Sequence, residues 1–344
     1  MDNKMDKKLE IKRLVIYLFF AFATTWTIFF LTYYCGEAHM WGERPKIDQM
    51  AALGMLCPTI AMLLTRFVTK EGFAVTGEGS MLLGISFKNR KWIWYIVAML
   101  LPWIYLEIGH ALYLLVNKAA FDANSPSILA ITENGAGIIY LIPLAGIISG
   151  TLGSFAAFGE EEGWRGYMMP KLINIMGINK AVIVGGIIWG IWHWPLTGVG
   201  HNFGNKYFGF PYTGCAMMCI LSIFMGIILT FITIKSESIW PAAILHAVNN
   251  ASPSILGLYI NEENLSGWRG DTIFAFVLTM LPMIAVATFF VSHMSRRKKH
   301  IQLTFELLQV KIKIVKKGVV ACIFHTCSSC RQDVFLDRWL DNFR

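Results

Sequence analysis

Charged residues are scarce in this sequence. Only 15% of its 344 residues are Asp, Glu, Lys or Arg, whereas 55% are hydrophobic, and the mean hydropathy is +0.52. An average soluble domain carries about 25% charged residues. This shortage disfavours a soluble globular domain and predicts a polytopic membrane protein.

Several motifs of well-known enzyme classes are also missing. The sequence has no nucleotide-phosphate loop, no Gly-x-Ser-x-Gly nucleophile elbow and no His-Glu-x-x-His zinc helix. No Ser or Cys stands out as a nucleophile paired with a base. Four of the seven cysteines are scattered and are expected to be small apolar core residues: Cys35, Cys57, Cys215 and Cys219. If this chain hydrolyses a substrate, water is the expected attacking group.

Long apolar runs dominate the chain instead. Eight runs approach the roughly 20 residues needed to cross the hydrocarbon core of a bilayer: Leu14–Tyr34, Met50–Val68, Trp92–Val116, Ile138–Phe158, Ala181–Pro195, Tyr212–Ile234, Ile239–Leu258 and Thr272–Val291. The first run is long and lacks a small-residue cleavage pattern, so we expect a retained span and not a signal peptide. The predicted fold is an all-α, polytopic membrane helical bundle of about eight transmembrane helices.

Basic residues gather at alternate ends of these runs. They lie in the leader, between the second and third runs and after the eighth: Lys4, Lys7, Lys8, Lys12, Arg13, Arg66, Lys70, Lys88, Arg90, Lys91, Arg296, Arg297, Lys298 and Lys299. Because Lys and Arg are retained on the cytoplasmic side, we predict that both termini are cytoplasmic (N-in/C-in). The net charge of +8 is then explained by membrane topology and by contact with anionic lipids. No nucleic-acid partner is expected.

The two ends of the chain differ from its apolar part. Residues 1–13 are expected to be a basic cytoplasmic leader, residues 14–294 the transmembrane bundle, and residues 295–344 a basic cytoplasmic tail. The tail contains a cluster that includes a Cys-x-x-Cys able to ligate zinc: Cys322, His325, Cys327 and Cys330. One such cluster without a second half at a distance does not establish a metal site.

Glu107 and His110 are polar residues of the third run and share one helical face. They can line an aqueous cavity or form a polar contact between helices. We expect the interhelical contact, because no third chemical group lies nearby in the sequence.

Glycines recur at helical neighbour spacing in the fourth and fifth runs: Gly146, Gly150, Gly153, Gly185, Gly186 and Gly190. Glycine lets another helix approach closely, since it has no side chain. Both helices are therefore expected to be tightly packed.

Three motifs place polar side chains on consecutive apolar segments: Glu160-Glu161-x-x-x-Arg165, Trp189-x-x-x-His193 and His246-x-x-x-Asn250. An ionisable residue inside a membrane segment is by default a functional-site hypothesis, because its desolvation must be compensated. Each motif alone has a structural explanation, such as a satisfied buried histidine or an ion pair. Together, on neighbouring spans, they predict a functional site in one cavity.

The four-residue spacing puts each pair on one helical face. Glu161 and Arg165 can form an intrahelical ion pair, while Glu160 is turned by about 100° and faces elsewhere. Trp189 can wall the imidazole of His193.

This set of groups suits the hydrolysis of an amide. Glu160 can take a proton from water and give it to the leaving amine, and His193 can share that proton. His246 and Asn250 project toward one point and can donate hydrogen bonds to a developing oxyanion.

The ordered motifs resemble those of the CPBP family of intramembrane endopeptidases, the CAAX prenyl protease and bacteriocin-processing group. The flanking residues also match the bacterial members: Gly-Trp-Arg-Gly-Tyr with Pro170 after it, Trp-His-Trp-Pro around His193, and Ile-Trp-Pro-Ala before His246. The resemblance covers about Ser149–Ser252, in a protease-like core at about 138–258, and does not extend to the tail. Two positions depart from the pattern, since Trp189 replaces the usual Phe and Glu162 a frequently apolar residue.

The resemblance implies a helical bundle in a cell membrane whose cavity opens toward the cytoplasm. It implies that Glu160 and His193 activate water and that His246 and Asn250 stabilise the oxyanion. The ion pair of the first motif would then be structural or substrate-positioning. The implied substrate is a membrane-associated peptide or a lipidated protein.

A metal-dependent mechanism is an alternative, because the family has been described as metalloproteases. Glu160, His193 and His246 can make a two-His, one-carboxylate zinc site with an open position. Asn250 is a poor zinc ligand but a suitable oxyanion donor. We therefore expect a glutamate-dependent mechanism that requires no cofactor, with zinc as the alternative.

Two other functions stay open at this point. Some relatives are linked to bacteriocin self-immunity or act as membrane scaffolds, and the same helices can serve a partner. A proton-coupled transporter also uses buried Glu and His, but the sequence has no pair of matching broken-helix halves.

The depth of the acidic residues in the membrane leads to one more prediction. A fourth helix that ended near Phe158 would leave Glu160 at the cytoplasmic surface, whereas His193 lies some 13 residues into the fifth run, roughly 20 Å deep. The two can meet only if the fourth helix continues through the acids to about Met168, with Pro170 following its end. The acidic stretch is therefore predicted to be helical and membrane-embedded.

Overall fold

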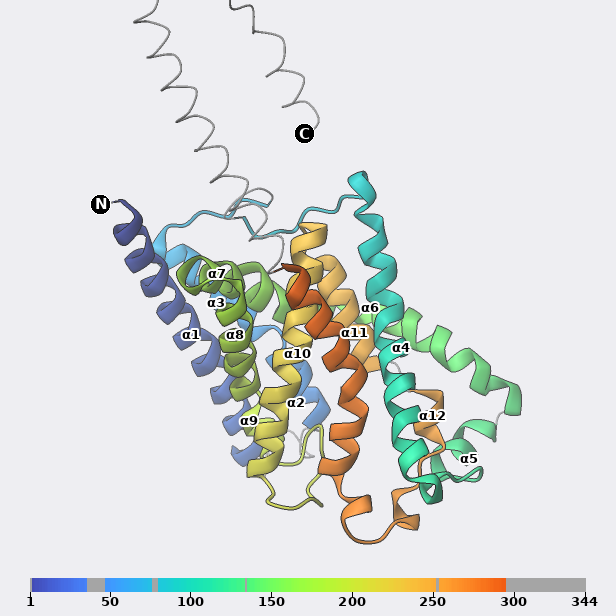
Figure 1. Ribbon diagram of the computed structural model, residues 1–344. Helices are drawn as coiled ribbons and strands as arrows, with labels where there is room; N and C mark the ends of the chain where they lie inside the picture. The colour runs from blue at the N-terminus through green and yellow to red at the C-terminus, as the bar shows by residue number, and fades with distance from the viewer. Residues whose placement is uncertain (1, 36–46, 76–79, 134, 252–253, 295–344) are drawn as a thin grey trace, which may run out of the picture. The chain divides into compact units, whose positions relative to one another are not determined.

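The computed structural model (Figure 1) describes residues 2–35, 47–75, 80–133, 135–251 and 254–294. The predicted tail and its cysteine-histidine cluster, Cys322, His325, Cys327 and Cys330, lie outside these residues. The regular structure of the described residues is helical, and the β-type contact found among them is an isolated bridge between Phe121 and Ile260. The prediction of an all-α fold is confirmed.

The α-helices follow one another with mostly short connections: α1 (Asp2–Cys35), α2 (Ile47–Gly54), α3 (Cys57–Thr69), α4 (Trp92–Val116), α5 (Pro126–Thr132), α6 (Ile142–Glu161), α7 (Met169–Met176), α8 (Ile178–Trp192), α9 (Trp194–Thr197), α10 (Tyr212–Ser236), α11 (Trp240–Ala251), α12 (Ile255–Leu258) and a last helix over Thr272–Met294. Short 3₁₀ segments are η1 (Lys88–Arg90), η2 (Lys118–Ala120), η3 (Ala136–Leu141), η5 (Glu262–Asn264) and η6 (Gly267–Gly270). The segment η4 (Glu162–Met168) is a π-helix that joins α6 to α7.

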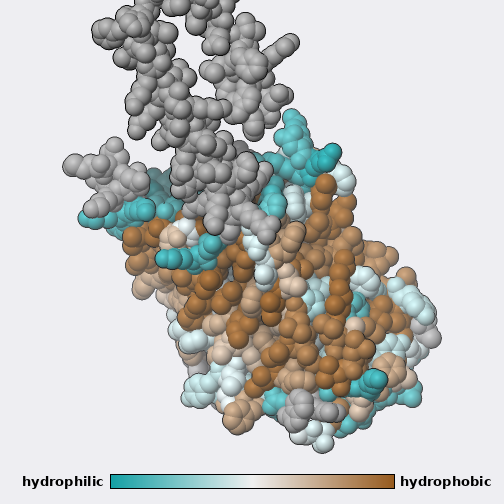
Figure 2. Space-filling view, viewed as in Figure 1, coloured by the Kyte–Doolittle hydropathy of each residue, from teal (hydrophilic) through white to brown (hydrophobic). Residues whose placement is uncertain are grey.

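Six helical stretches of the described chain are long and apolar enough to cross a membrane: Lys7–Leu31, Ala51–Thr69, Lys88–Val116, Gly137–Met176, Tyr212–Ser236 and Thr272–Met294. The fifth and seventh of the eight expected spans are the shorter helices α8, with 15 residues, and α11, with 12. α8 packs against α10, and α11 packs against α6 and α4. Helices that pack closely against other helices need not match the thickness of a bilayer along their whole surface. Figure 2 shows the broad apolar surface of the longer helices below a hydrophilic end.

One end of the bundle is hydrophilic and contains the start of α1 and the end of the last helix (Figures 1 and 2). The segments at this end are rich in Lys and Arg. α1 begins at Asp2, so the expected leader forms the first part of this helix. An ion pair of 2.8 Å between Lys91 and Glu237 connects two segments at this end. We call it the basic end, comprising residues 2–13, 70–75, 80–91, 171–180 and 235–240. The opposite end comprises residues 117–133, 135–141, 193–211 and 254–271.

Glu71 ties α1 and α7 to the loop after α3 at the basic end. Its carboxylate accepts hydrogen bonds from Lys171 Nζ at 2.8 Å, from the Tyr167 hydroxyl, and from Thr69 Oγ1 at 2.7 Å. Arg13 Nε lies 3.5 Å from the same carboxylate. Burial alone raises the pKa of Glu71, but the hydrogen bonds outweigh burial and lower this pKa. The ionised carboxylate therefore closes a polar cluster over the buried part of the bundle.

Glycines let the helices that carry the predicted site approach their neighbours closely. A Cβ atom on Gly150 of α6 would lie 2.5 Å from the Cα of Val248 in α11, and one on Gly186 of α8 would lie 2.4 Å from the Cα of Ile223 in α10. Both helices are tightly packed, as expected, and their partners are α11 and α10. Gly153 takes no part, since a Cβ there would meet nothing within 4 Å.

Glu107 joins α4 to the start of α12. Its carboxylate accepts hydrogen bonds from the Ser254 hydroxyl at 2.9 Å and from the backbone N–H groups of Ile255 and Leu256. This is an interhelical polar contact of the kind expected. His110 does not share it, because its Nδ1 hydrogen-bonds to a carbonyl of its own helix and its ring lines a separate pocket of about 600 Å³ at the opposite end.

We expect Gly186→Ala to lower the free energy of unfolding by about 1–3 kcal/mol, because the added methyl group must push α8 and α10 apart. Gly153→Ala is the matched control. It should be neutral or stabilising, since Ala in a helix is favoured over Gly by about 0.5–1 kcal/mol. Unfolding transitions of the purified variants in detergent measure the difference, and equal stability of the two would contradict the close approach at Gly186.

Candidate active site

The acidic stretch is helical, as the depth of the predicted site required. α6 passes into η4 and then into α7, so the helix continues to Met176. The N–H of Met169 donates to the carbonyl of Trp164, five residues back, as in a π-helix. The expected end near Met168, ahead of Pro170, is wrong. Pro170 lies in the first turn of α7, where the hydrogen-bond register changes and a missing N–H is tolerated.

Glu161 is completely buried and holds two partners with one oxygen. Its Oε1 lies 3.2 Å from an Nη1 of Arg165 and 2.8 Å from Nδ1 of His246. The first contact is the expected intrahelical ion pair. The second joins α6 to α11 and was not predicted, because residue spacing within one helix says nothing about contacts between helices. The carboxylate thus compensates a guanidinium and an imidazole that are also buried.

Trp189 contacts both the first and the second motif. Its indole N–H donates to Oε2 of Glu160 at 2.8 Å, and the guanidinium carbon of Arg165 lies 4.0 Å from the centre of its ring. The backbone carbonyl of Trp189 lies 2.8 Å from Nδ1 of His193. A Phe at this position could offer its ring to the guanidinium but no N–H to the carboxylate. The exchange of Phe for Trp therefore adds a hydrogen bond to the predicted general base.

Glu162, the third acid, does not line the cavity described below. Its carboxylate is buried, and neither oxygen has a hydrogen-bond partner among the described residues. The register inferred from Arg165, with Glu161 in the ion pair and Glu160 directed elsewhere, agrees with these positions.

The two histidines have different partners at Nδ1. His193 faces a backbone carbonyl, which only accepts, so its Nδ1 carries the proton and its Nε2 is an acceptor. His246 faces the carboxylate of Glu161, which stabilises a ring protonated on both nitrogens. The rings of Trp189 and Trp192 meet His193 edge-on, with centroids 5.5 and 4.7 Å away. Aromatic packing and hydrogen bonds together fix the orientation of this imidazole.

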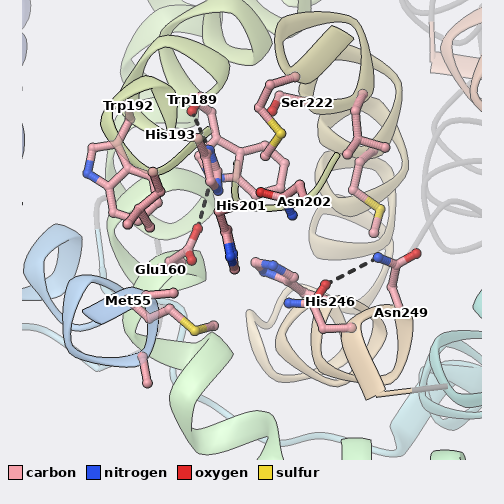
Figure 3. Close-up of a pocket in the computed structure, with 17 residues that line it drawn as sticks. Met55, Glu160, Trp189, Trp192, His193, His201, Asn202, Ser222, His246 and Asn249 are labelled. Carbon is pink, nitrogen blue, oxygen red and sulfur yellow. Dashed lines mark hydrogen bonds between the residues drawn. The ribbon is translucent and has the colours of Figure 1, made fainter. Parts of the chain in front are cut away.

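The predicted catalytic groups meet at one cavity of about 460 Å³ (Figure 3). Glu160, His193, His246 and Asn250 all line it, as does Trp189. Glu161 and Arg165 do not line the cavity, so they act on it through their partners. The wall also contains apolar side chains: Ala51, Ala52, Met55, Trp192, Leu196, Met218, Leu221 and Met225.

Four polar residues of the cavity were not predicted from the sequence: His201, Asn202, Ser222 and Asn249. His201 and Asn202 belong to the connection after α9, and nothing in the sequence places that connection against the motifs. Ser222 is a single hydroxyl within the apolar α10. Asn249 is adjacent to Asn250, and the spacing from His246 selected only the latter.

Asn249 links Asn250 to a buried tyrosine of α4. The Tyr105 hydroxyl donates to Oδ1 of Asn249 at 2.5 Å, and Nδ2 of Asn249 donates to Oδ1 of Asn250 at 3.2 Å. This chain of hydrogen bonds occupies the carbonyl oxygen of Asn250. The NH₂ group of Asn250 is left to donate into the cavity.

The zinc set considered from the sequence is not preassembled. Glu160, His193 and His246 line the same cavity, but no three His, Cys, Asp or Glu side chains in the described part of the chain converge as metal ligands. One nitrogen of each imidazole and one oxygen of Glu160 are already held by hydrogen bonds within the protein.

We expect Trp189→Phe to destabilise the protein by about 1–3 kcal/mol more than Trp164→Phe, because it leaves an oxygen of the buried Glu160 without its donor. Trp164 is the matched control, since it is also fully buried but its indole nitrogen has no hydrogen-bond partner among the described residues. Denaturant unfolding of both variants in detergent measures the difference. Equal losses would show that the indole N–H contributes nothing to Glu160.

Comparisons with known proteins agree with the motifs. A family model described as Type II CAAX prenyl endopeptidase Rce1-like matches residues 142–252. CAAX prenyl protease 2 of Methanococcus maripaludis is 36% identical to this chain over 105 residues, which are 30% of this chain and 38% of that protein. The chain thus matches well under half the length of this relative. Residues 142–252, which carry the three motifs of the cavity, are therefore similar in sequence to Type II CAAX prenyl endopeptidases of the Rce1-like family.

Proposed function

We propose that this protein is an intramembrane endopeptidase that hydrolyses a peptide bond in a membrane-associated peptide or lipidated protein. The observation that carries the proposal is the cavity, where Glu160, His193, His246 and Asn250 meet from three separate segments of the chain. The relationship to CAAX prenyl proteases supports the same reaction. No contact among the described residues specifically favours immunity, a scaffold role or proton transport.

Glu160 and His193 are placed to activate water. Trp189 occupies Oε2 of Glu160, which leaves Oε1 to accept a proton from a water molecule in the cavity. Nε2 of His193 is an acceptor and can hold the same water. The water oxygen attacks the peptide carbonyl to form a tetrahedral intermediate. The proton held by Glu160 then moves to the leaving amine as the C–N bond breaks.

His246 and Asn250 are placed to stabilise the oxyanion of that intermediate. Glu161 on Nδ1 of His246 favours the protonated ring, so that Nε2–H can donate a hydrogen bond. Asn249 occupies the carbonyl oxygen of Asn250, so that its NH₂ group can donate a second one. The role of Glu161 is therefore to hold and charge a donor, at a distance from the substrate.

Glu160→Gln should lower peptide-bond hydrolysis by about 10²–10⁴-fold, because the amide cannot accept the proton of the attacking water. His193→Ala should also lose activity. The measurement is comparative proteomics of membrane peptides from cells with the unaltered protein or the Glu160→Gln chain. A product found only with the unaltered protein identifies both activity and substrate, whereas an unchanged peptide profile or phenotype with Glu160→Gln would favour a scaffold or immunity role.

Tyr105→Phe should lower kcat by about tenfold with little change in KM, because the amide of Asn249 is then free to rotate and Asn250 loses its orientation. Tyr113→Phe removes a hydroxyl from the same helix, outside the cavity, and should leave kcat unchanged. In an Asn249→Ala background, Tyr105→Phe should have no further effect. Independent, multiplying effects of the two substitutions would contradict the hydrogen-bond chain.

A further inference from the structure

We infer that the cavity opens toward the non-cytoplasmic face of the membrane, so that the protein receives its substrate from that side. The direction of the opening is inferred from charge and packing alone. The consequence for the substrate rests on the proposed peptidase function. The test is therefore chosen so that it does not depend on activity.

The charge of the two ends orients the bundle. The basic end carries many cations: Lys7, Lys8, Lys12, Arg13, Lys70, Lys88, Arg90, Lys91, Lys171, Lys180 and Lys235. The opposite end carries fewer cations, and its acids outnumber them: the cations are Lys118, Lys206 and Arg269, and the acids are Asp122, Glu133, Glu262, Glu263 and Asp271. Lys and Arg in short connections are retained on the cytoplasmic side. The basic end is therefore cytoplasmic.

Packed side chains separate the cavity from the basic end. Trp164 and Tyr167, which follow Glu160 toward that end, are 0% and 1% exposed. Tyr17 of α1 is also 0% exposed, and its ring centroid lies 5.7 Å from that of Trp164 and 5.1 Å from that of Tyr167. The polar cluster around Glu71 lies beyond them. A peptide arriving from the cytoplasm would have to displace this packing to reach Glu160.

Exposed side chains line the cavity on its other side. Ala52, Asn202 and Asn250 are exposed, and His201 is half-buried. His201 and Asn202 belong to the connection between α9 and α10, which is part of the opposite end. The residues that line the cavity are thus more exposed near the opposite end, and those between the cavity and the basic end are buried.

The depth of His193 agrees with an opening on that side. α8 starts at the basic end with Ile178, and His193 follows Trp192, the last residue of this helix. At 1.5 Å per residue, the imidazole lies about 22 Å from the basic end of the helix. The hydrocarbon core is about 30 Å thick. The water-activating pair therefore lies in the outer part of the membrane.

This orientation differs from the cytoplasmic opening that the family resemblance implies. The motifs determine which chemical groups meet, but the cations at the helix ends determine which way the bundle is inserted. A cytoplasmic opening would require the basic end to face outward, against the retention of its cations. The orientation is therefore inferred from the charge distribution of this chain and not from the resemblance.

The orientation narrows the substrate class of the proposed peptidase. The expected substrate is a membrane-anchored peptide or protein segment whose scissile bond lies at the non-cytoplasmic interface. Its apolar side chains can lie against Met55, Met218 and Met225, while its carbonyl faces His246 and Asn250. A C-terminus that is lipidated and held in the cytoplasm would not reach the cavity.

The test is the accessibility of single cysteines to a small, charged, membrane-impermeant thiol reagent, in the full-length chain with its native cysteines replaced. Asn202→Cys reports the mouth of the cavity, and Ser222→Cys reports its buried wall. Lys88→Cys is the control at the basic end, where residue 88 is exposed. Each variant is labelled in intact cells and in inside-out membrane vesicles, with and without Glu160→Gln.

We expect Asn202→Cys and Ser222→Cys to be labelled in intact cells, and Lys88→Cys to be labelled only in inside-out vesicles. The Glu160→Gln chain should give the same pattern, so that a failure of the proposed peptidase would leave this result intact. Labelling of the two cavity positions only in inside-out vesicles would overturn the inference. Labelling of Lys88→Cys in intact cells, or of Ser222→Cys only after solubilisation in detergent, would also overturn it.

Discussion

The carboxylate of Glu161 is the constraint on which the rest of the site depends. A membrane bundle offers little water to solvate a charge, so each buried charge needs a partner fixed by the fold. Glu161 Oε1 lies within 3.2 Å of a nitrogen of both Arg165 and His246 and thereby couples α6 to η4 and α11. The close approach at Gly150 and Val248 makes this contact geometrically possible. Without it, a guanidinium and an imidazole would lie buried and uncompensated.

Trp189 extends this arrangement from the ion pair to the groups proposed to activate water. One side chain presents a ring face to Arg165 and an N–H to Glu160, while its backbone carbonyl faces His193. The two histidines therefore differ through their partners and not through their own chemistry. A carbonyl keeps His193 an acceptor, and a carboxylate makes His246 a donor. This difference is why His193 is proposed to help activate water and His246 to stabilise the oxyanion.

The sequence could predict features that depend on spacing within one helix. These include the apolar spans and the Glu161–Arg165 pair. The continuation of the helix through the acids was predicted in another way, by requiring that Glu160 and His193 lie at the same depth in the membrane. The sequence could not predict contacts made between helices, such as those of Asn249 with Tyr105 or of His246 with Glu161. An apolar run also does not distinguish lipid from protein as its neighbour, and two of the eight expected spans are short helices that pack closely against other helices. Tertiary packing determines both the contacts between helices and which apolar helices are short.

The inferred direction in which the cavity opens combines two independent properties of the chain. Packing separates the proposed catalytic groups from the basic end by a closed layer around Trp164 and Tyr167. The cations outside the helices then decide which face of the membrane that layer meets. A change of a few surface charges can therefore invert the side from which substrate enters without altering any contact in the cavity.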